Sequence, residues 1–100
     1  MLNVALFARL EAKLGKEADV VKFLQVALEM ANQEPTTLMW FALRLGPSTF
    51  GVFDAFADEK GRERHLTGPI AKALTDQTPN LFSVPPVIER LDVLGAKMPK

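Results

Sequence analysis

Cysteine and tyrosine are absent from this chain, and histidine and tryptophan each occur only once. Without cysteine the protein can form no disulfide, no thiolate nucleophile and no cysteine-based zinc site. One histidine is too few for a usual transition-metal site, although carboxylates could still hold a hard cation. The lack of cysteine is also compatible with the cytoplasm, where we expect the protein to reside.

The chain has 12 basic and 12 acidic residues, so its net charge is zero. Neither sign of charge is clustered in one part of the sequence. A nucleic-acid partner requires a basic surface that displaces counterions, so we expect none. No apolar run approaches the roughly 20 residues of a membrane span. The apolar start is not followed by the small-residue cleavage site of a signal peptide. We therefore expect no membrane partner either.

The chain has 100 residues, 48% of them hydrophobic, which is enough for one domain with its own core. Alternating and helical periodicities predict four strands and three helical segments. Pro35 ends the first helix, Asp58 caps the second, and Pro69 starts the third. We expect the triplet at residues 78–80 to lie beyond the third helix. The predicted strands cover residues 2–14, 37–45, 50–57 and 87–94, the helices cover 17–33, 59–67 and 69–74, and the ordered core of about 2–94 is followed by a loose tail at 95–100.

The second predicted strand, residues 37–45, carries large apolar side chains on both faces, which predicts burial on both. If the turn after it is centred on Pro47, Trp40 lies opposite Asp54. The order β-α-β-β-α-β predicts a ferredoxin-like α+β sandwich, with a four-stranded antiparallel sheet and its helices on one face. The other face has apolar side chains that nothing in the chain covers. We therefore expect a homodimer formed through the sheet face.

His65 and Asp54 are the candidates for acid–base chemistry. The imidazole of His65 could accept a proton from a phenolic substrate, or it could cap a carbonyl and anchor the turn before Gly68. Asp54 lies in an apolar strand, where a carboxylate needs a partner. It could orient His65 in a site, or belong to an ion pair at the dimer interface. Its possible partners are Arg9, Arg44, Arg90 and His65.

The aromatic residues of the second and third strands could hold a planar ligand or simply fill the core. Trp40 is the strongest candidate for a pocket wall, because its indole N–H needs a partner and its cross-strand neighbour is Asp54. Phe56 is the second candidate. The charged run at residues 59–64 is interpreted as a solvated helix face. No Ser-His-Asp order, glycine-rich phosphate loop or metal cluster is found in the sequence.

Three stretches, LEAKLGKEADV, EPTTLMWFALR and above all FDAFADEKGRERHLTGPIAKAL, resemble the antibiotic biosynthesis monooxygenase (ABM) family. The resemblance covers nearly the whole chain. It implies a dimeric α+β barrel of two ferredoxin-like protomers with a ligand pocket between each sheet and its helices. It also implies cofactor-free oxidation of aromatic polyketides or hydroquinones by O2. A related haem-degrading branch requires Asn, Trp and His where this chain has Ala8, His65 and Thr75, so haem degradation is disfavoured.

Our leading hypothesis is a cofactor-independent monooxygenase, an oxidoreductase acting on an electron-rich aromatic such as a polyketide anthrone or a hydroquinone. In it His65 accepts a proton, and Asp54 is its orienting partner or an alternative base. Trp40 and Phe56 contact the ring, and no cofactor or metal takes part. The alternative is a non-catalytic module that binds a small molecule in the same pocket.

Overall fold

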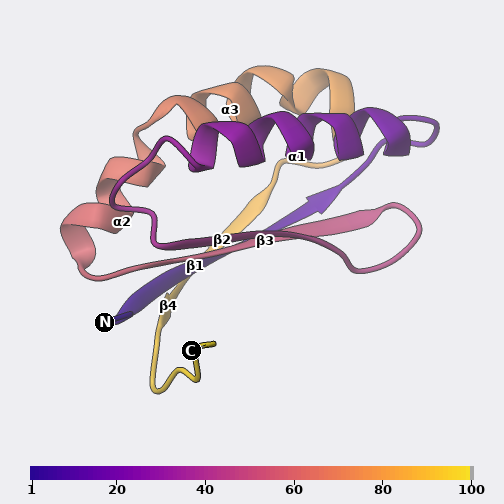
Figure 1. Cartoon of the computed structure of the whole chain (residues 1–100). Helices are drawn as coiled ribbons and strands as arrows, with labels where there is room; N and C mark the ends of the chain where they lie inside the picture. The colour runs from indigo at the N-terminus through magenta and orange to yellow at the C-terminus, as the bar shows by residue number, and fades with distance from the viewer. Residues whose placement is uncertain (100) are drawn as a thin grey trace.

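A computed structural model describes residues 1–99 of the chain. The sheet has the strand order β2-β3-β1-β4, and every neighbouring pair is antiparallel. All three helices lie on one face of this sheet (Figure 1). The predicted ferredoxin-like α+β sandwich is therefore confirmed. In chain order the elements are β1 (Val4–Glu11), α1 (Glu17–Ala31), β2 (Met39–Arg44), β3 (Thr49–Phe56), α2 (Glu59–Leu66), α3 (Pro69–Leu81) and β4 (Val87–Asp92).

The β2–β3 hairpin has the register that its turn predicted, with Trp40 opposite Asp54 and Arg44 opposite Phe50. Because side chains alternate between the faces of a strand, Phe50 and Asp54 point to the same side. Phe50 belongs to the core cluster that also contains Val20 of α1, so this side is the one covered by helices. The register thus brings the only tryptophan and a carboxylate together beneath the helices.

Helix α3 is longer than the sequence predicted. It runs through residues 78–80 to Leu81, with Pro79 inside its last turn. A proline there removes one backbone hydrogen bond, but it leaves the preceding turns intact. Leu81 and Phe82 are buried in the core with Leu10 and Phe50, and this burial offsets the lost bond.

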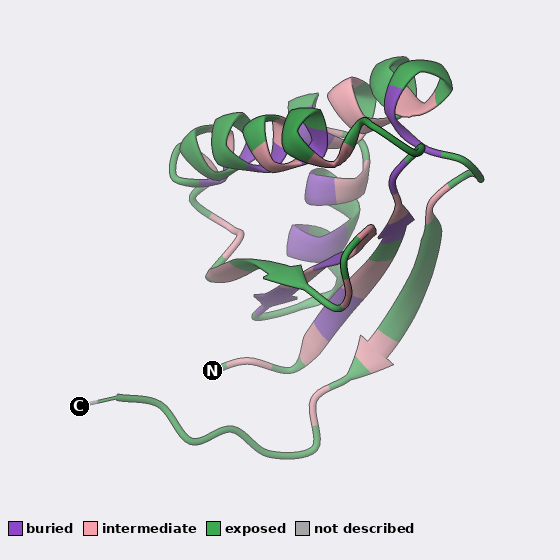
Figure 2. Cartoon of the chain, turned by 90° about the vertical axis from the view of Figure 1, so that its right-hand side faces the viewer, coloured by how far each residue is buried: buried purple, intermediate pink, exposed green. Residues whose placement is uncertain are grey.

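Strand β2 is an exposed edge, contrary to the predicted burial of both its faces. Phe41 is 44% exposed and Leu43 is 39% exposed. The reason is that β2 has only β3 as a neighbour and the helices cover only one face of the sheet. Figure 2 shows the same contrast, since the edge strands are largely exposed and the buried residues lie on the central strands and inner helix faces. The first strand is shorter than the predicted range 2–14, since β1 ends at Glu11, and Leu14 beyond it is 97% exposed.

The start of α2 confirms the predicted cap, because the Asp58 carboxylate accepts a hydrogen bond of 2.9 Å from the Gly61 amide. The charged run that follows is not wholly solvated, as Arg62 is only 6% exposed. Its guanidinium donates to the carbonyl oxygens of Ala5 (3.2 Å) and Leu91 (3.1 Å). A long cation can reach strand carbonyls beneath its helix, and charge patterning does not reveal this. Arg62 thereby ties α2 to β1 and β4.

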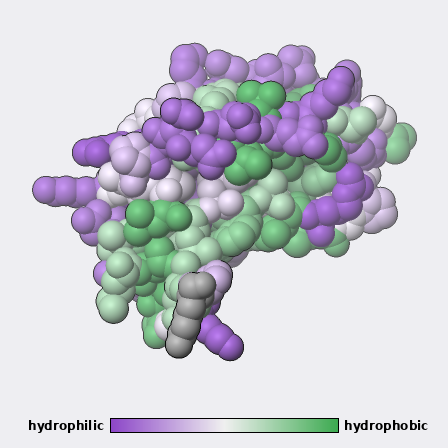
Figure 3. All heavy atoms as spheres, viewed as in Figure 1, coloured by the Kyte–Doolittle hydropathy of each residue, from purple (hydrophilic) through white to green (hydrophobic). Residues whose placement is uncertain are grey.

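The face of the sheet away from the helices carries a row of aromatic side chains. Phe41, Phe53 and Phe7 are paired in a row across β2, β3 and β1. Figure 3 shows apolar side chains gathered on the sheet side, below the charged outer surface of the helices. Residues 93–99 form no helix or strand, while Lys100 of the predicted tail lies outside the described residues. Within residues 1–99 no helix has both the length and the apolar character needed to cross a membrane.

Candidate functional site

The single histidine lies between two carboxylates. His65, on α2, places its Nε2 atom 3.1 Å from Oδ2 of Asp54 on β3. Its Nδ1 atom is 2.7 Å from Oε1 of Glu34, in the loop between α1 and β2. The Thr37 hydroxyl donates a bond of 2.7 Å to the same Glu34 oxygen. Both nitrogens of the imidazole are thus occupied by acidic groups.

Asp54 therefore finds its partner in His65, which was one of the four candidates from the sequence. The arginines considered as alternatives have other contacts: Arg9 pairs with Glu11, Arg90 pairs with Glu59 and Glu63, and Arg44 donates to the Pro47 carbonyl.

Glu34 is a member of the site that sequence reasoning missed. It lies 31 positions before His65, in a loop with no periodicity. The signal that could have found it is weak: an acidic side chain immediately before Pro35, where the loop must turn toward β2. Only the packing of this loop against α2 brings Glu34 to the imidazole.

Burial is the largest influence on the pKa of His65 and disfavours its charged form. The hydrogen bonds and negative charges of Asp54 and Glu34 together outweigh it, so the pKa is raised above 6.5. Burial also raises the pKa of Asp54 above 3.8, opposed by His65 and reinforced by the negative charge of Glu34. Between these two transitions the Asp54–His65 pair carries one proton, as an imidazolium beside a carboxylate.

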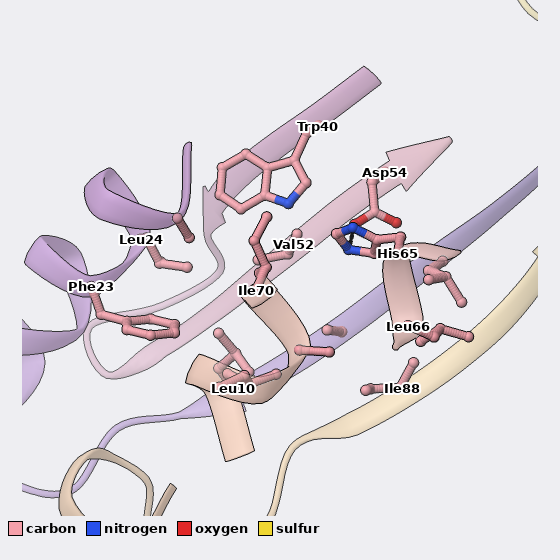
Figure 4. A pocket seen from close by; sticks show the side chains of 15 residues that line it. Leu10, Phe23, Leu24, Trp40, Val52, Asp54, His65, Leu66, Ile70 and Ile88 are labelled. Carbon is pink, nitrogen blue, oxygen red and sulfur yellow. Dashed lines mark ion pairs between the residues drawn. The ribbon is translucent and has the colours of Figure 1, made fainter. Parts of the chain in front are cut away.

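An apolar cavity of about 50 Å³ lies beside this pair, between the sheet and the helices. Figure 4 shows Phe23 and Leu24 of α1, Ile70 of α3 and the Asp54–His65 pair around it, with the indole nitrogen of Trp40 facing inward. Two residues of this wall each hold a buried polar atom, Trp40 Nε1 and Asp54 Oδ1, that has no hydrogen-bond partner within residues 1–99. Buried polar atoms normally have one, so this pair marks where a ligand or water can bind.

Of the two aromatic residues expected to contact a ligand, Trp40 lies at the cavity and Phe56 does not. Trp40 lines the cavity. Phe56 is fully buried and is not part of the cavity wall. Its ring instead packs against the imidazole of His65, with the ring centres 5.5 Å apart. Phe56 therefore packs against His65 and does not contact the cavity. The lining residues that were not named from the sequence include Phe23 and Leu24 of α1 and Ile70 of α3.

The donor atoms of the site do not converge on one point, because Asp54 and Glu34 bind opposite nitrogens of the His65 ring. In the described part of the chain, no group of three or more His, Asp or Glu side chains is arranged to hold a metal ion.

Comparison of the whole chain with solved structures shows strong similarity to a protein from Nitrosomonas europaea. A protein of unknown function from Nitrosomonas europaea is 57% identical, with a TM-score of 0.96, and the match covers 100% of this chain and 97% of that one. The chain belongs to the same family as this protein. No family model matches the sequence, and no curated protein matches it either.

More distant structures share the fold. A Caulobacter crescentus protein provisionally named an antibiotic biosynthesis monooxygenase is 23% identical, with a TM-score of 0.79 and coverage of 94% of this chain and 92% of that one. A Nitrosomonas europaea protein with the same provisional name is 15% identical, with a TM-score of 0.82 and coverage of 92% and 90%. The chain thus shares its fold with proteins that carry this provisional name, which agrees with the fold that the sequence resemblance implied.

Proposed function

We propose that this protein is an ABM-family monooxygenase that oxidises a hydroxylated aromatic ring with O2 and without a cofactor. The fold shared with provisionally named monooxygenases supports the family. The observation that carries the reaction is that two residues lining one apolar cavity, Trp40 and Asp54, each hold a buried polar atom without a partner, the donor Nε1 and the acceptor Oδ1. A phenolic hydroxyl can accept from the first and donate to the second.

In this proposal Asp54 is the base, which was the alternative role for this residue in the sequence-based hypothesis. His65 is less suited to that role, because a carboxylate lies against each of its nitrogens. Burial raises the pKa of Asp54, which makes its carboxylate a stronger base than an exposed aspartate. The imidazolium of His65 stabilises the negative charge at this site, which lies on the Asp54 carboxylate before the proton transfer and on the ring after it.

The chemistry after deprotonation belongs to the ring and O2. The anion transfers an electron to O2, the resulting radicals combine into a carbon–oxygen bond, and the O–O bond of the peroxide then breaks. One oxygen atom stays on the ring carbon and the other leaves as water, so the ring loses four electrons and O2 gains four. The protein has only to bind the ring, accept the proton and exclude water.

The cavity favours a small substrate. A water molecule needs roughly 10–15 Å³ of such space, so a cavity of about 50 Å³ holds a few waters and no tricyclic ring. Trp40 and Leu24 also line a surface groove of about 480 Å³ between α1 and β2. Displacement of the Trp40 indole would join the groove to the cavity. A single-ring hydroquinone requires less displacement than an anthrone, so we propose the hydroquinone class.

Oxygen uptake tests this proposal. Protein free of flavin, haem and metal should accelerate O2 consumption by a single-ring hydroquinone above the uncatalysed rate, and ¹⁸O2 should place one labelled atom in the product. Trp40 is the only tryptophan and tyrosine is absent, so fluorescence excited at the indole band reports ring binding directly. Binding without acceleration of O2 uptake would overturn the monooxygenase and support the alternative, a non-catalytic binding module.

We also propose that the protein is a homodimer formed through the open face of the sheet. The support is the aromatic row of Phe7, Phe41 and Phe53, which nothing within residues 1–99 covers on its outer side. Apolar surface of this kind is typical of an interface. Light scattering should give twice the chain mass of 11.0 kDa, and a monomer at micromolar concentration would refute the dimer.

A further inference from the structure

His65 lies between two separate hollows in the protein. One is the internal cavity, whose wall includes Asp54. The other is an open surface pocket of about 510 Å³ on the opposite side, where the α1–β2 loop meets the junction of α2 and α3. Glu34, Arg64 and His65 are among the residues that line this surface pocket. Among the residues that line these two hollows, His65 alone belongs to both walls.

The polar contacts form an unbroken line between the two hollows. Asp54 lines the cavity, and its Oδ2 atom lies 3.1 Å from His65 Nε2. His65 Nδ1 is 2.7 Å from Glu34. The exposed fractions of the three side chains are 3% for Asp54, 8% for His65 and 17% for Glu34. Exposure therefore increases step by step along the line, from the cavity toward the solvent.

We propose that Asp54, His65 and Glu34 form a proton relay from the internal cavity to the surface, with Glu34 as its outlet. This inference builds on the proposed function, since a relay is useful only if a bound ligand releases a proton inside the cavity. Glu34 does not line that cavity, so it is a relay residue that acts through His65 and does not contact the substrate.

The proton count of the relay balances. A ligand hydroxyl transfers its proton to Oδ1 of Asp54, which raises the proton count of the Asp54–His65 pair by one. The imidazolium then releases the proton on Nδ1 to the Glu34 carboxylate, and Glu34 passes it to water in the surface pocket. The pair returns to its original proton count, although the proton that leaves is not the one that entered.

The surroundings of Glu34 suit this role. The Thr37 hydroxyl holds Oε1 of Glu34 against the ring, and Arg64 is the basic residue in the wall of the surface pocket. The charged groups near His65 are thus Asp54 from β3, Glu34 from the α1–β2 loop and Arg64 from its own helix. A carboxylate at the outlet can accept a proton, and its 2.7 Å contact with Nδ1 is much shorter than the 3.5 Å contact of the Thr37 hydroxyl with the same nitrogen.

The substitution Glu34→Gln tests the relay, because glutamine keeps the shape and the hydrogen bond but cannot carry a proton. Since His65 is the only histidine, ¹⁵N-histidine labelling gives the signals of a single imidazole. We expect exchange of its N–H protons with water to be about 10²-fold slower in Glu34→Gln than in the wild type, the lower end of what a positioned acid or base contributes. The matched control is Glu29→Gln, at an exposed glutamate on α1, which should exchange like the wild type.

Exchange in Glu34→Gln that is unchanged or faster would overturn the relay, because opening of the structure would then control proton access. With a hydroquinone that is turned over, Glu34→Gln should lower kcat by a similar factor and leave KM unchanged. If neither protein oxidises any hydroquinone while exchange still depends on Glu34, the relay is upheld and only the proposed monooxygenase function is refuted.

Discussion

Replacement of Asp54 by asparagine is the most direct test of the proposed chemistry. The side chain is only 3% exposed, with Oδ2 beside His65 and Oδ1 buried without a partner. Asparagine has nearly the same shape and can still accept a hydrogen bond from His65 Nε2. It cannot accept a proton from a ligand hydroxyl. The substitution therefore removes the base and leaves the cavity almost unchanged.

The expected loss follows from the role of a positioned base. General bases contribute roughly 10²–10⁴-fold to a rate, which corresponds to about 3–5 kcal/mol in the activation barrier. The cost in folding stability should be smaller than the 3–5 kcal/mol typical of a broken buried pair, about 1–3 kcal/mol, because Glu34 stays 2.7 Å from the imidazolium. The loss of the Asp54 charge should also lower the pKa of His65 relative to the wild type.

Oxygen uptake with a hydroquinone, together with chemical denaturation, separates these effects. The control is Asp76→Asn, which removes an exposed carboxylate paired with Lys72 on α3 and should leave turnover unchanged. If folded Asp54→Asn consumes O2 as fast as the wild type, Asp54 is not the base and the assignment is wrong.

Two further predictions concern stability. The raised pKa of His65 means that the folded state binds its proton more tightly than the unfolded chain does, so the stabilisation is complete below pH 6.5 and is lost as the pH rises through the folded-state pKa. Urea denaturation should show this decline in the wild type, and a decline of equal size in His65→Gln would exclude His65 as its source. Arg62→Ala removes a buried guanidinium that donates to the carbonyls of Ala5 and Leu91, and should cost about 3–5 kcal/mol. The exposed Arg64→Ala on the same helix is its control, and similar losses for the two variants would show that burial of Arg62 contributes nothing.

The fold could be predicted from local patterns, and the reason is visible in particular elements. Alternation gave the strands, and the apolar stripe containing Val20 and Leu24 gave α1, because each pattern depends on neighbours two to four positions away. The Asp58 cap and the pairing of Trp40 with Asp54 across a short hairpin are local in the same sense. Such features depend on backbone geometry that the nearby residues determine by themselves.

Local patterns failed where an environment depends on distant segments. The helix through Pro79 is maintained by the burial of Leu81 and Phe82, and the exposure of Phe41 follows from the position of β2 at the sheet edge. Arg62 belongs to a charged run, yet its guanidinium is buried because α2 crosses strand ends whose carbonyls it can reach.

The sequence by itself determined the type and order of the elements, the register of the β2–β3 hairpin and the presence of His65 and Asp54 as candidate groups. Only the tertiary structure decided what those groups do to each other. Glu34 and His65 are 31 positions apart and meet because a loop packs on α2. That packing places a carboxylate against each nitrogen of the imidazole and leaves Asp54 Oδ1 without a partner, which is why we propose Asp54 rather than His65 as the base. Pairwise electrostatics depends on distance and burial, and the fold sets both.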